Sequence, residues 1–159
     1  MLVLEEAIKK LKEKFGVDVL RDKHGYFWAK VDRSIIIDVL RFLKNQGFTQ
    51  LVTITGIDRP QNGTIELIYH LSYEENGYGL LNISTDVSRE RPVIETAYFI
   101  YNSAYIYERE IFDLLGVKFI GHPELKRVLL PEDIPKGIHP LRKDWKGNIA
   151  ELKRRGEKA

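Results

Sequence analysis

Residues 64–71, Thr-Ile-Glu-Leu-Ile-Tyr-His-Leu, decide the fold class predicted for this chain of 159 residues. Every second position is apolar, and these side chains would share one face of an extended strand: Ile65, Leu67, Tyr69 and Leu71. The turn-forming pairs Asn62-Gly63 and Asn76-Gly77 stand before and after the stretch. The pattern predicts a half-buried β-strand between two turns, so the surrounding chain has to supply the rest of a sheet and a cover for its apolar face.

Four more strand candidates surround this stretch. Thr49–Thr55 precedes it and Tyr78–Asp86 follows it, so three consecutive strands are expected in the middle of the chain. Val17–Arg21 and Tyr26–Val31 are rich in aromatic and β-branched residues and are separated by a turn that contains Gly25, which favours a hairpin. The five strands together predict one sheet.

Two amphipathic helices are expected to cover one face of that sheet. The apolar residues of the first recur at helical spacing: Leu4, Ala7, Ile8, Leu11 and Phe15. This helix ends at Gly16. The second begins near Asp32 or Ser34, either of which could cap it, and ends at Gly47. The order helix, two strands, helix, three strands predicts an α+β fold, a two-layer α/β sandwich with a five-stranded sheet.

A helical segment and an extended arm follow the sandwich. Val93–Leu115 is expected to be helical, with an interruption near Asn102-Ser103, where either residue could cap a new start. Residues 121–159 contain four of the six prolines and no sustained periodicity. We therefore divide the chain into an α+β domain, residues 1–120, and an extended C-terminal arm, residues 121–159.

The arm is basic and partly apolar. Residues 121–159 carry ten basic and six acidic side chains, whereas residues 1–120 carry fifteen and seventeen. The apolar residues of the arm are too many for a solvated linker: Val128, Leu129, Leu130, Ile134, Ile138, Leu141 and Trp145. A proline-rich arm of this length has little reason to pack on its own small domain, so we expect it to dock on a partner protein and to become ordered there.

Composition and motifs exclude several function classes. The chain has no cysteine, which rules out disulfides, thiolate-ligated iron–sulfur clusters and cysteine nucleophiles. A net charge of +2 gives no support to nucleic acid as a partner, and no stretch is long and apolar enough for a membrane span. No nucleotide-binding loop or hydrolase nucleophile motif appears, and the histidines at 24, 70, 122 and 139 lack the spacing of a metal site. We predict no catalytic, cofactor-binding or metal-binding residue in this chain.

The densest group of charges is Glu108-Arg109-Glu110 together with Asp113. On a helix Arg109 and Asp113 stand four residues apart and Glu110 and Asp113 three apart, so an ion-pair cluster on one face is possible. One interpretation is a free-standing acid/base enzyme in which Glu110 and Asp113 form a carboxylate pair for proton transfer. The other is a salt-bridge cluster that faces solvent or a partner, which is favoured because no nucleophile or metal-ligand set stands nearby.

The end of the chain offers a separate alternative. Lys153-Arg154-Arg155, with Lys146 and Lys158, forms a basic tail that could make the chain an RNA-binding module or bind anionic lipid. A solvated terminus explains the same residues and is favoured.

From Ser103 onward the sequence resembles one family. The pattern is Ser-Ala-x-x-Tyr-Glu-Arg-Glu-x-x-Asp-x-x-Gly-x-x-Phe-x-Gly-His-Pro-x-Leu-x-Arg over residues 103–127, followed by His-Pro-Leu-Arg-Lys-Asp over residues 139–144. It is similar to the signature of the 30-kDa subunit family of respiratory complex I. This family includes the corresponding subunit of the bacterial NADH:quinone oxidoreductase, and its relatives occur in membrane-bound energy-converting hydrogenases. The order of helices and strands predicted above agrees with that family's fold.

The resemblance implies a non-catalytic, hydrophilic subunit in the peripheral arm of a membrane complex, on the cytoplasmic side of the cell membrane. It implies two partners, a large subunit related to that of nickel–iron hydrogenases and a small iron–sulfur subunit. Iron–sulfur clusters, and a nickel–iron centre in hydrogenase-type relatives, would belong to those partners and not to this chain.

The resemblance also assigns subunit-interface roles to nine residues. A docking and helix-orienting cluster would comprise Glu108, Arg109, Glu110 and Asp113. Five further residues would anchor the arm: His122, Arg127, His139, Arg142 and Lys143. The two arginines among them are suited to bidentate pairing with carboxylates.

The sequence departs from the family pattern in two places, and a third stretch resembles one branch of the family. Ile106 stands where the family usually has tryptophan, and Trp145-Lys146-Gly147-Asn148 replaces the usual Phe-Pro continuation. Residues 130–138 look like the versions in archaeal ferredoxin-linked complexes, which include membrane hydrogenases and a related sulfur-reducing complex. We therefore expect an ion-translocating complex that passes electrons from ferredoxin, or NADH, to protons, sulfur compounds or quinone.

Overall fold

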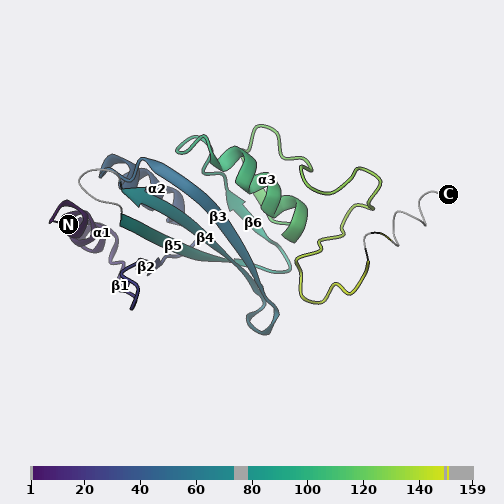
Figure 1. The fold of residues 1–159 in the computed structure, drawn as a ribbon, viewed down its shortest axis with the longest axis horizontal. Helices are drawn as coiled ribbons and strands as arrows, with labels where there is room; N and C mark the ends of the chain where they lie inside the picture. Colours follow the sequence, from purple (N-terminus) through teal and green to yellow (C-terminus); the bar gives the residue numbers. More distant parts are fainter. Residues whose placement is uncertain (1, 74–78, 149, 151–159) are drawn as a thin grey trace.

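The body of the molecule is a five-stranded mixed sheet (Figure 1). The computed structural model describes residues 2–73, 79–148 and 150. The strands are β1 (Val19–Arg21), β2 (Phe27–Lys30), β3 (Gln50–Arg59), β4 (Thr64–Tyr73) and β5 (Gly79–Ser88). They lie in the order β1-β2-β5-β4-β3, in which β2 and β5 are parallel and all other neighbours antiparallel. The single sheet and the hairpin of β1 and β2 confirm the prediction.

β4 contains the stretch from which the fold was predicted. The four alternating side chains on its inner face are buried: Ile65, Leu67, Tyr69 and Leu71. β4 pairs along its whole length with β5 on one side, and with β3 on the other. Because the pairing with β4 continues to Arg59, β3 runs past its predicted end at Thr55. The predicted turn at Asn76-Gly77 lies outside the described residues.

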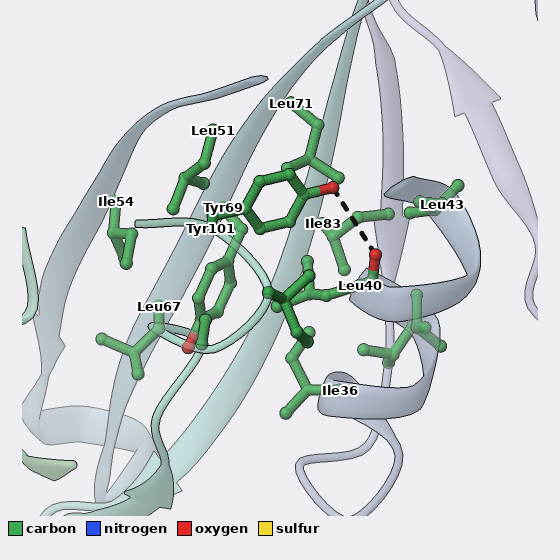
Figure 2. Packing of buried hydrophobic residues seen from close by; sticks show 14 of the residues in the cluster. Ile36, Leu40, Leu43, Leu51, Ile54, Leu67, Tyr69, Leu71, Ile83 and Tyr101 are labelled. Atoms are coloured by element: carbon green, nitrogen blue, oxygen red, sulfur yellow. Dashed lines mark hydrogen bonds between the residues drawn. The ribbon is translucent and has the colours of Figure 1, made fainter. Parts of the chain in front are cut away.

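Two helices, α1 (Leu2–Phe15) and α2 (Ile36–Asn45), pack on the inner face of the sheet. Figure 2 shows Ile36 and Leu40 of α2 beside the inner-face side chains of β4 and β5. The longest helix, α1, has 14 residues. Within the described part of the chain, no helix has the length and hydropathy needed to cross a membrane.

The start of α2 differs from its prediction. Neither Asp32 nor Ser34 caps the helix, since Ile35 is the N-cap and no side chain bonds to the first turn. Asp32 instead accepts the backbone N–H of Ser34 at 2.8 Å and its hydroxyl at 2.6 Å. The two polar residues thus stabilise a turn before the helix, a local bond that competes with capping.

A third helix, α3 (Ala104–Leu115), packs on β3. Gly56 of β3 pairs with Leu67, so its α-carbon lies over the same inner face. A β-carbon at Gly56 would lie far inside van der Waals contact with the Leu115 side chain of α3. The close approach of α3 to the sheet therefore depends on glycine at this position.

The prediction that Val93 starts a helix is wrong. Val93–Glu95 forms β6, which pairs in parallel with β7 (Lys118–Ile120) in a separate two-stranded sheet. β-branched residues such as Val93 suit a strand, but the partner strand lies beyond α3 and leaves no local signal. The helix starts only after Ser103, whose hydroxyl donates to the Leu51 carbonyl at 3.0 Å instead of capping.

Polar side chains are bonded to one another on the opposite face of the five-stranded sheet. His70 Nε2 lies 2.9 Å from Thr55 Oγ1, and His70 Nδ1 lies 2.7 Å from Asn82 Oδ1. The amide of Asn82 in turn donates to the Phe27 carbonyl at 3.2 Å. His70 therefore links three strands.

We predict that Gly56→Val lowers the free energy of unfolding by about 2 kcal/mol, because the new side chain displaces Leu115 and lifts α3 from β3. Urea denaturation followed by circular dichroism measures the loss. Leu115→Ala alone should cost about 3 kcal/mol, because it leaves a cavity. The double variant should cost less than the sum of the two, and strictly additive losses would show that Gly56 and Leu115 do not meet.

Candidate functional site

The four charged residues of the predicted cluster on α3 have different surroundings. Glu108 turns toward the body of the domain, and Arg109 and Asp113 turn toward the arm. Glu110 lies on the remaining side of the helix and is partly exposed. They form no single cluster, because successive residues of a helix project in different directions around its axis.

Glu108 is fully buried and joins α3 to the segment after β6. Its carboxylate accepts the Ala97 N–H at 2.7 Å and the Thr96 hydroxyl at 2.5 Å. Burial raises the pKa of Glu108 to about 7, although the two hydrogen bonds act in the opposite direction. The Tyr69 hydroxyl is also buried, and burial, with the charge of Glu108, raises the pKa of Tyr69.

Asp113 fixes the first part of the arm to α3. Its Oδ2 atom accepts three consecutive backbone N–H groups, those of Val128, Leu129 and Leu130, at 3.2, 2.9 and 2.7 Å. The side chain is almost fully buried, and its Oδ1 lies 3.7 Å from Nε of Arg127. One buried carboxylate thus replaces the backbone partners that a strand or helix would give these residues.

Two arginines hold carbonyl groups of the arm. Arg109 donates to the carbonyls of Lys126 and Arg127 at 3.1 and 2.9 Å. Arg127 donates to three carbonyls further along the arm, those of Pro131, Ile134 and Pro135. The expected ion pair between Arg109 and Asp113 is therefore replaced by bonds from each residue to the arm.

Two histidines attach the arm near the two ends of α3. His122 Nε2 lies 2.9 Å from the Tyr105 carbonyl in the first turn. His139 Nδ1 lies 3.1 Å from the Asp113 carbonyl in the last turn. Gly116 ends the helix with a φ angle of 80°, and a β-carbon there would collide with the His139 ring. The arm therefore leaves and rejoins α3 at defined points (Figure 1).

The return of the arm is held by an ion-pair group that the sequence did not reveal. Buried Asp58 accepts two bonds from Arg89, at 2.8 and 3.1 Å, and the Lys143 N–H at 2.8 Å. Asp144 pairs with Arg89 at 2.7 Å. The Arg89 side chain holds the pKa of Asp58 below its usual range. One feature of the sequence could have indicated this group: Asp58 is an acidic residue at a position of β3 that faces the protein interior, where a carboxylate needs a partner.

Arg142 completes the attachment. Its Nε donates to the Leu115 carbonyl at 2.9 Å and its Nη1 to the Arg89 carbonyl at 3.3 Å. Four of the five residues expected to anchor the arm make bonds that hold it to the chain's own body: His122, His139, Arg142 and, through its backbone N–H, Lys143. The hydrogen bonds of Arg127 stay within the arm, and its 3.7 Å ion pair with Asp113 reaches α3. For Arg142 and Arg127 the bonded groups are mainly carbonyls, and the bidentate arginine–carboxylate pair is that of Arg89 with Asp58.

The expectation that the arm has no reason to pack on its own domain is wrong. Leu130 and Ile134 are buried within the chain. The physical reason is that α3 offers a buried carboxylate, carbonyls at its C-terminal end and the Arg109 guanidinium group to an otherwise unpaired backbone. Docking of the outer side of the arm on a partner stays a prediction. Lys153-Arg154-Arg155 lies outside the described residues.

The arrangement does not support acid/base chemistry by Glu110 and Asp113. The Asp113 carboxylate is buried and occupied by arm N–H groups, whereas Glu110 lies on the outside of the helix. Among the residues that the structure describes, no group of three or more histidine and acidic side chains is placed to hold a metal ion. The geometry defines a class of protein: an α+β domain with an arm fastened to a charged helix.

The chain belongs to the family described as respiratory-chain NADH dehydrogenase, 30 Kd subunit, whose model matches residues 29–151. This confirms the resemblance seen in the sequence. One relative, an NADH-quinone oxidoreductase subunit of Moorella thermoacetica, is 39% identical over 103 residues, 65% of this chain and 68% of that one. Another, an F(420)H(2) dehydrogenase subunit of Methanosarcina mazei, is 37% identical over 120 residues, 75% of each chain.

A solved structure extends the similarity to nearly the whole chain. It is a chain in the membrane-bound sulfane sulfur reductase, described as an archaeal respiratory membrane complex. The two chains are 29% identical and superpose with a TM-score of 0.78, covering 95% of this chain and 89% of the other. The similarity therefore includes the arm as well as the sandwich.

We predict that Asp113→Ala lowers the free energy of unfolding by about 3 kcal/mol, because three arm N–H groups lose one charged acceptor. Asp113→Asn should cost about half as much, since its side-chain oxygen can still accept. Hydrogen exchange of the amides of residues 128–130 should speed up in both variants. Unchanged exchange there would contradict the role of Asp113 in fixing the arm.

We predict that Glu108 makes the chain less stable as the pH rises. Its ordinary pKa of 4.5 applies to the unfolded chain, and the folded value is about 7, so the folded state binds more protons between these limits. Stability contributed by the protonated form is complete below pH 4.5 and is lost as the pH passes 7, a change of about 3 kcal/mol.

Glu108→Gln should remove this pH dependence, because an amide can occupy the same site without charge. Urea denaturation at intervals between pH 4.5 and 8 measures the slope for each variant. Glu110→Gln is the matched control, since it removes a carboxylate from the outside of the same helix. Equal slopes for the wild type and Glu108→Gln would refute the assignment.

Proposed function

We propose that this chain is a non-catalytic peripheral subunit of a membrane-bound, ion-translocating oxidoreductase related to complex I. The observation that carries the proposal is the similarity over almost the whole length to a chain of the archaeal sulfane sulfur reductase complex. Relatives named as subunits of NADH-quinone and F(420)H(2) enzymes support the same role. A protein whose similarity extends through its arm is expected to use that arm in the same kind of assembly.

The site supports a scaffolding role. The most distinctive charged residues, Glu108, Arg109 and Asp113, are used to fix the position of α3 and the arm. They therefore specify the shape of a surface. We propose that this surface receives a large subunit related to that of nickel–iron hydrogenases, together with a small iron–sulfur subunit, on the cytoplasmic side of the membrane.

Cofactors are proposed for the partners. The lack of cysteine leaves this chain without the thiolates that iron–sulfur clusters require, so clusters would lie in neighbouring subunits. Electrons would pass through these from ferredoxin, or NADH, to protons, sulfur compounds or quinone. The sulfane sulfur reductase relative supports a sulfur compound as the acceptor. A free-standing enzyme and an RNA-binding module have no comparable support in the structure or among the relatives.

We predict that an affinity-tagged copy, expressed in the source organism, is recovered from detergent-solubilised membranes with several iron-containing subunits. Mass spectrometry identifies the subunits, and metal analysis identifies the acceptor type. Nickel would indicate a hydrogenase, while iron without nickel would favour a sulfur-reducing or quinone-reducing complex. The matched control is the same tag on an unrelated chain. Recovery of the tagged chain as a free monomer in the soluble fraction would overturn the proposal.

A further inference from the structure

One side of α3 is only partly covered by the body and by the arm. Ile106, Glu110 and Leu114 follow one another at four-residue spacing, so they form a stripe along this side. The backbones of two exposed arm leucines lie against the same helix, because the Leu129 N–H bonds to Asp113 and the Leu141 N–H bonds to the Leu114 carbonyl. We call these five residues the α3 outer face.

The α3 outer face is apolar except for one charge. Leu129 and Leu141 are 54% and 55% exposed, and Ile106 is 36% exposed. These are large apolar side chains, and a group of them around one site is typical of a surface that another protein covers. Glu110 stands in the middle of the stripe.

Glu110 differs from the other charges of its motif. Glu108, Arg109 and Asp113 each bond to the body or to the arm. In the described part of the chain, Glu110 has neither a hydrogen bond nor an ion pair. The fold therefore does not account for this carboxylate, although it accounts for its three neighbours.

We propose that the α3 outer face docks a partner subunit that places an arginine or lysine against Glu110, with aliphatic side chains around it. The inference rests on the proposed function, since it specifies the chemistry of one contact between this chain and its complex. A carboxylate that loses its water in an interface must gain an opposite charge, because an unpaired buried charge is costly. The apolar rim makes Glu110 the central polar contact of such an interface.

Charge argues against two other occupants. A symmetric contact between two copies of this chain on this face would bring the two Glu110 carboxylates together. An anionic lipid surface would also meet a like charge. A basic partner surface satisfies the carboxylate, and the aliphatic rim then excludes water from the pair.

A competition inside cells tests this inference. A tagged variant and the untagged wild-type chain are expressed together in the source organism, and the membrane complex is purified through another subunit. Mass spectrometry compares the ratio of the two chains in the complex with their ratio in the whole extract. Glu110→Gln should lower the relative incorporation roughly 30-fold or more, and Glu110→Lys further.

Glu5 provides the matched control, because it is an exposed carboxylate on another helix, α1. Glu5→Gln and Glu5→Lys should enter the complex like the wild type. Urea denaturation of each isolated variant should give a wild-type midpoint for Glu110→Gln, since Glu110 makes no bond within the described chain. A loss of incorporation then reports docking and not misfolding.

The outcomes separate the inference from the proposed function. If the tagged wild type enters no complex, the proposed function fails. If it enters and the Glu110 variants enter equally well, only the inference fails. A variant with Lys153, Arg154 and Arg155 all replaced by glutamine completes the test. If this triple variant loses as much incorporation as Glu110→Gln, and the two changes combined lose no more, the partner of Glu110 is a basic residue of the chain's own C-terminal end. That result would overturn the inference.

Discussion

An extended segment that packs on a domain must find partners for its peptide groups, because it has no helix or sheet of its own to supply them. In this protein the charged side chains of α3 meet that requirement. Asp113 accepts three consecutive N–H groups of the arm, and Arg109 holds carbonyls just before them. Arg127, itself a residue of the arm, then donates to the carbonyls of Pro131 and Pro135 further along it. The burial of Leu130 and Ile134 accompanies these bonds.

The sandwich could be predicted because its signals are local. The alternation along β4 and the glycines after α1 and α2 are properties of short stretches. β6 and β7 could not be predicted, since each has three residues and their parallel pairing spans the whole of α3. The spacing of Arg109 and Asp113 suggested a bond between them. Both residues bond to peptide groups of the arm instead, because those peptide groups would be costly to bury unpaired. A spacing rule within one helix does not include this competition.

The charged motif at residues 108–113 therefore serves mainly to hold α3 and the arm in position. Of the residues in its charged motif, Glu108 and Asp113 are buried, and Glu110 alone faces outward without an internal partner in the described chain. Family membership indicates an assembly, and the geometry indicates which side chains are still available to it. A sequence motif of this kind combines two requirements, one for folding and one for association, in neighbouring residues.

The arm is fastened on both sides of one short stretch. Arg127 holds the carbonyl of Pro135, and His139 bonds to the Asp113 carbonyl, so Lys136, Gly137 and Ile138 bridge two anchors. Closing a longer loop between fixed ends costs only about 0.6 kcal/mol for each doubling of its length. Evolution can therefore insert residues at this point and extend the reach of the molecule toward a differently shaped neighbour, while both anchors keep their geometry.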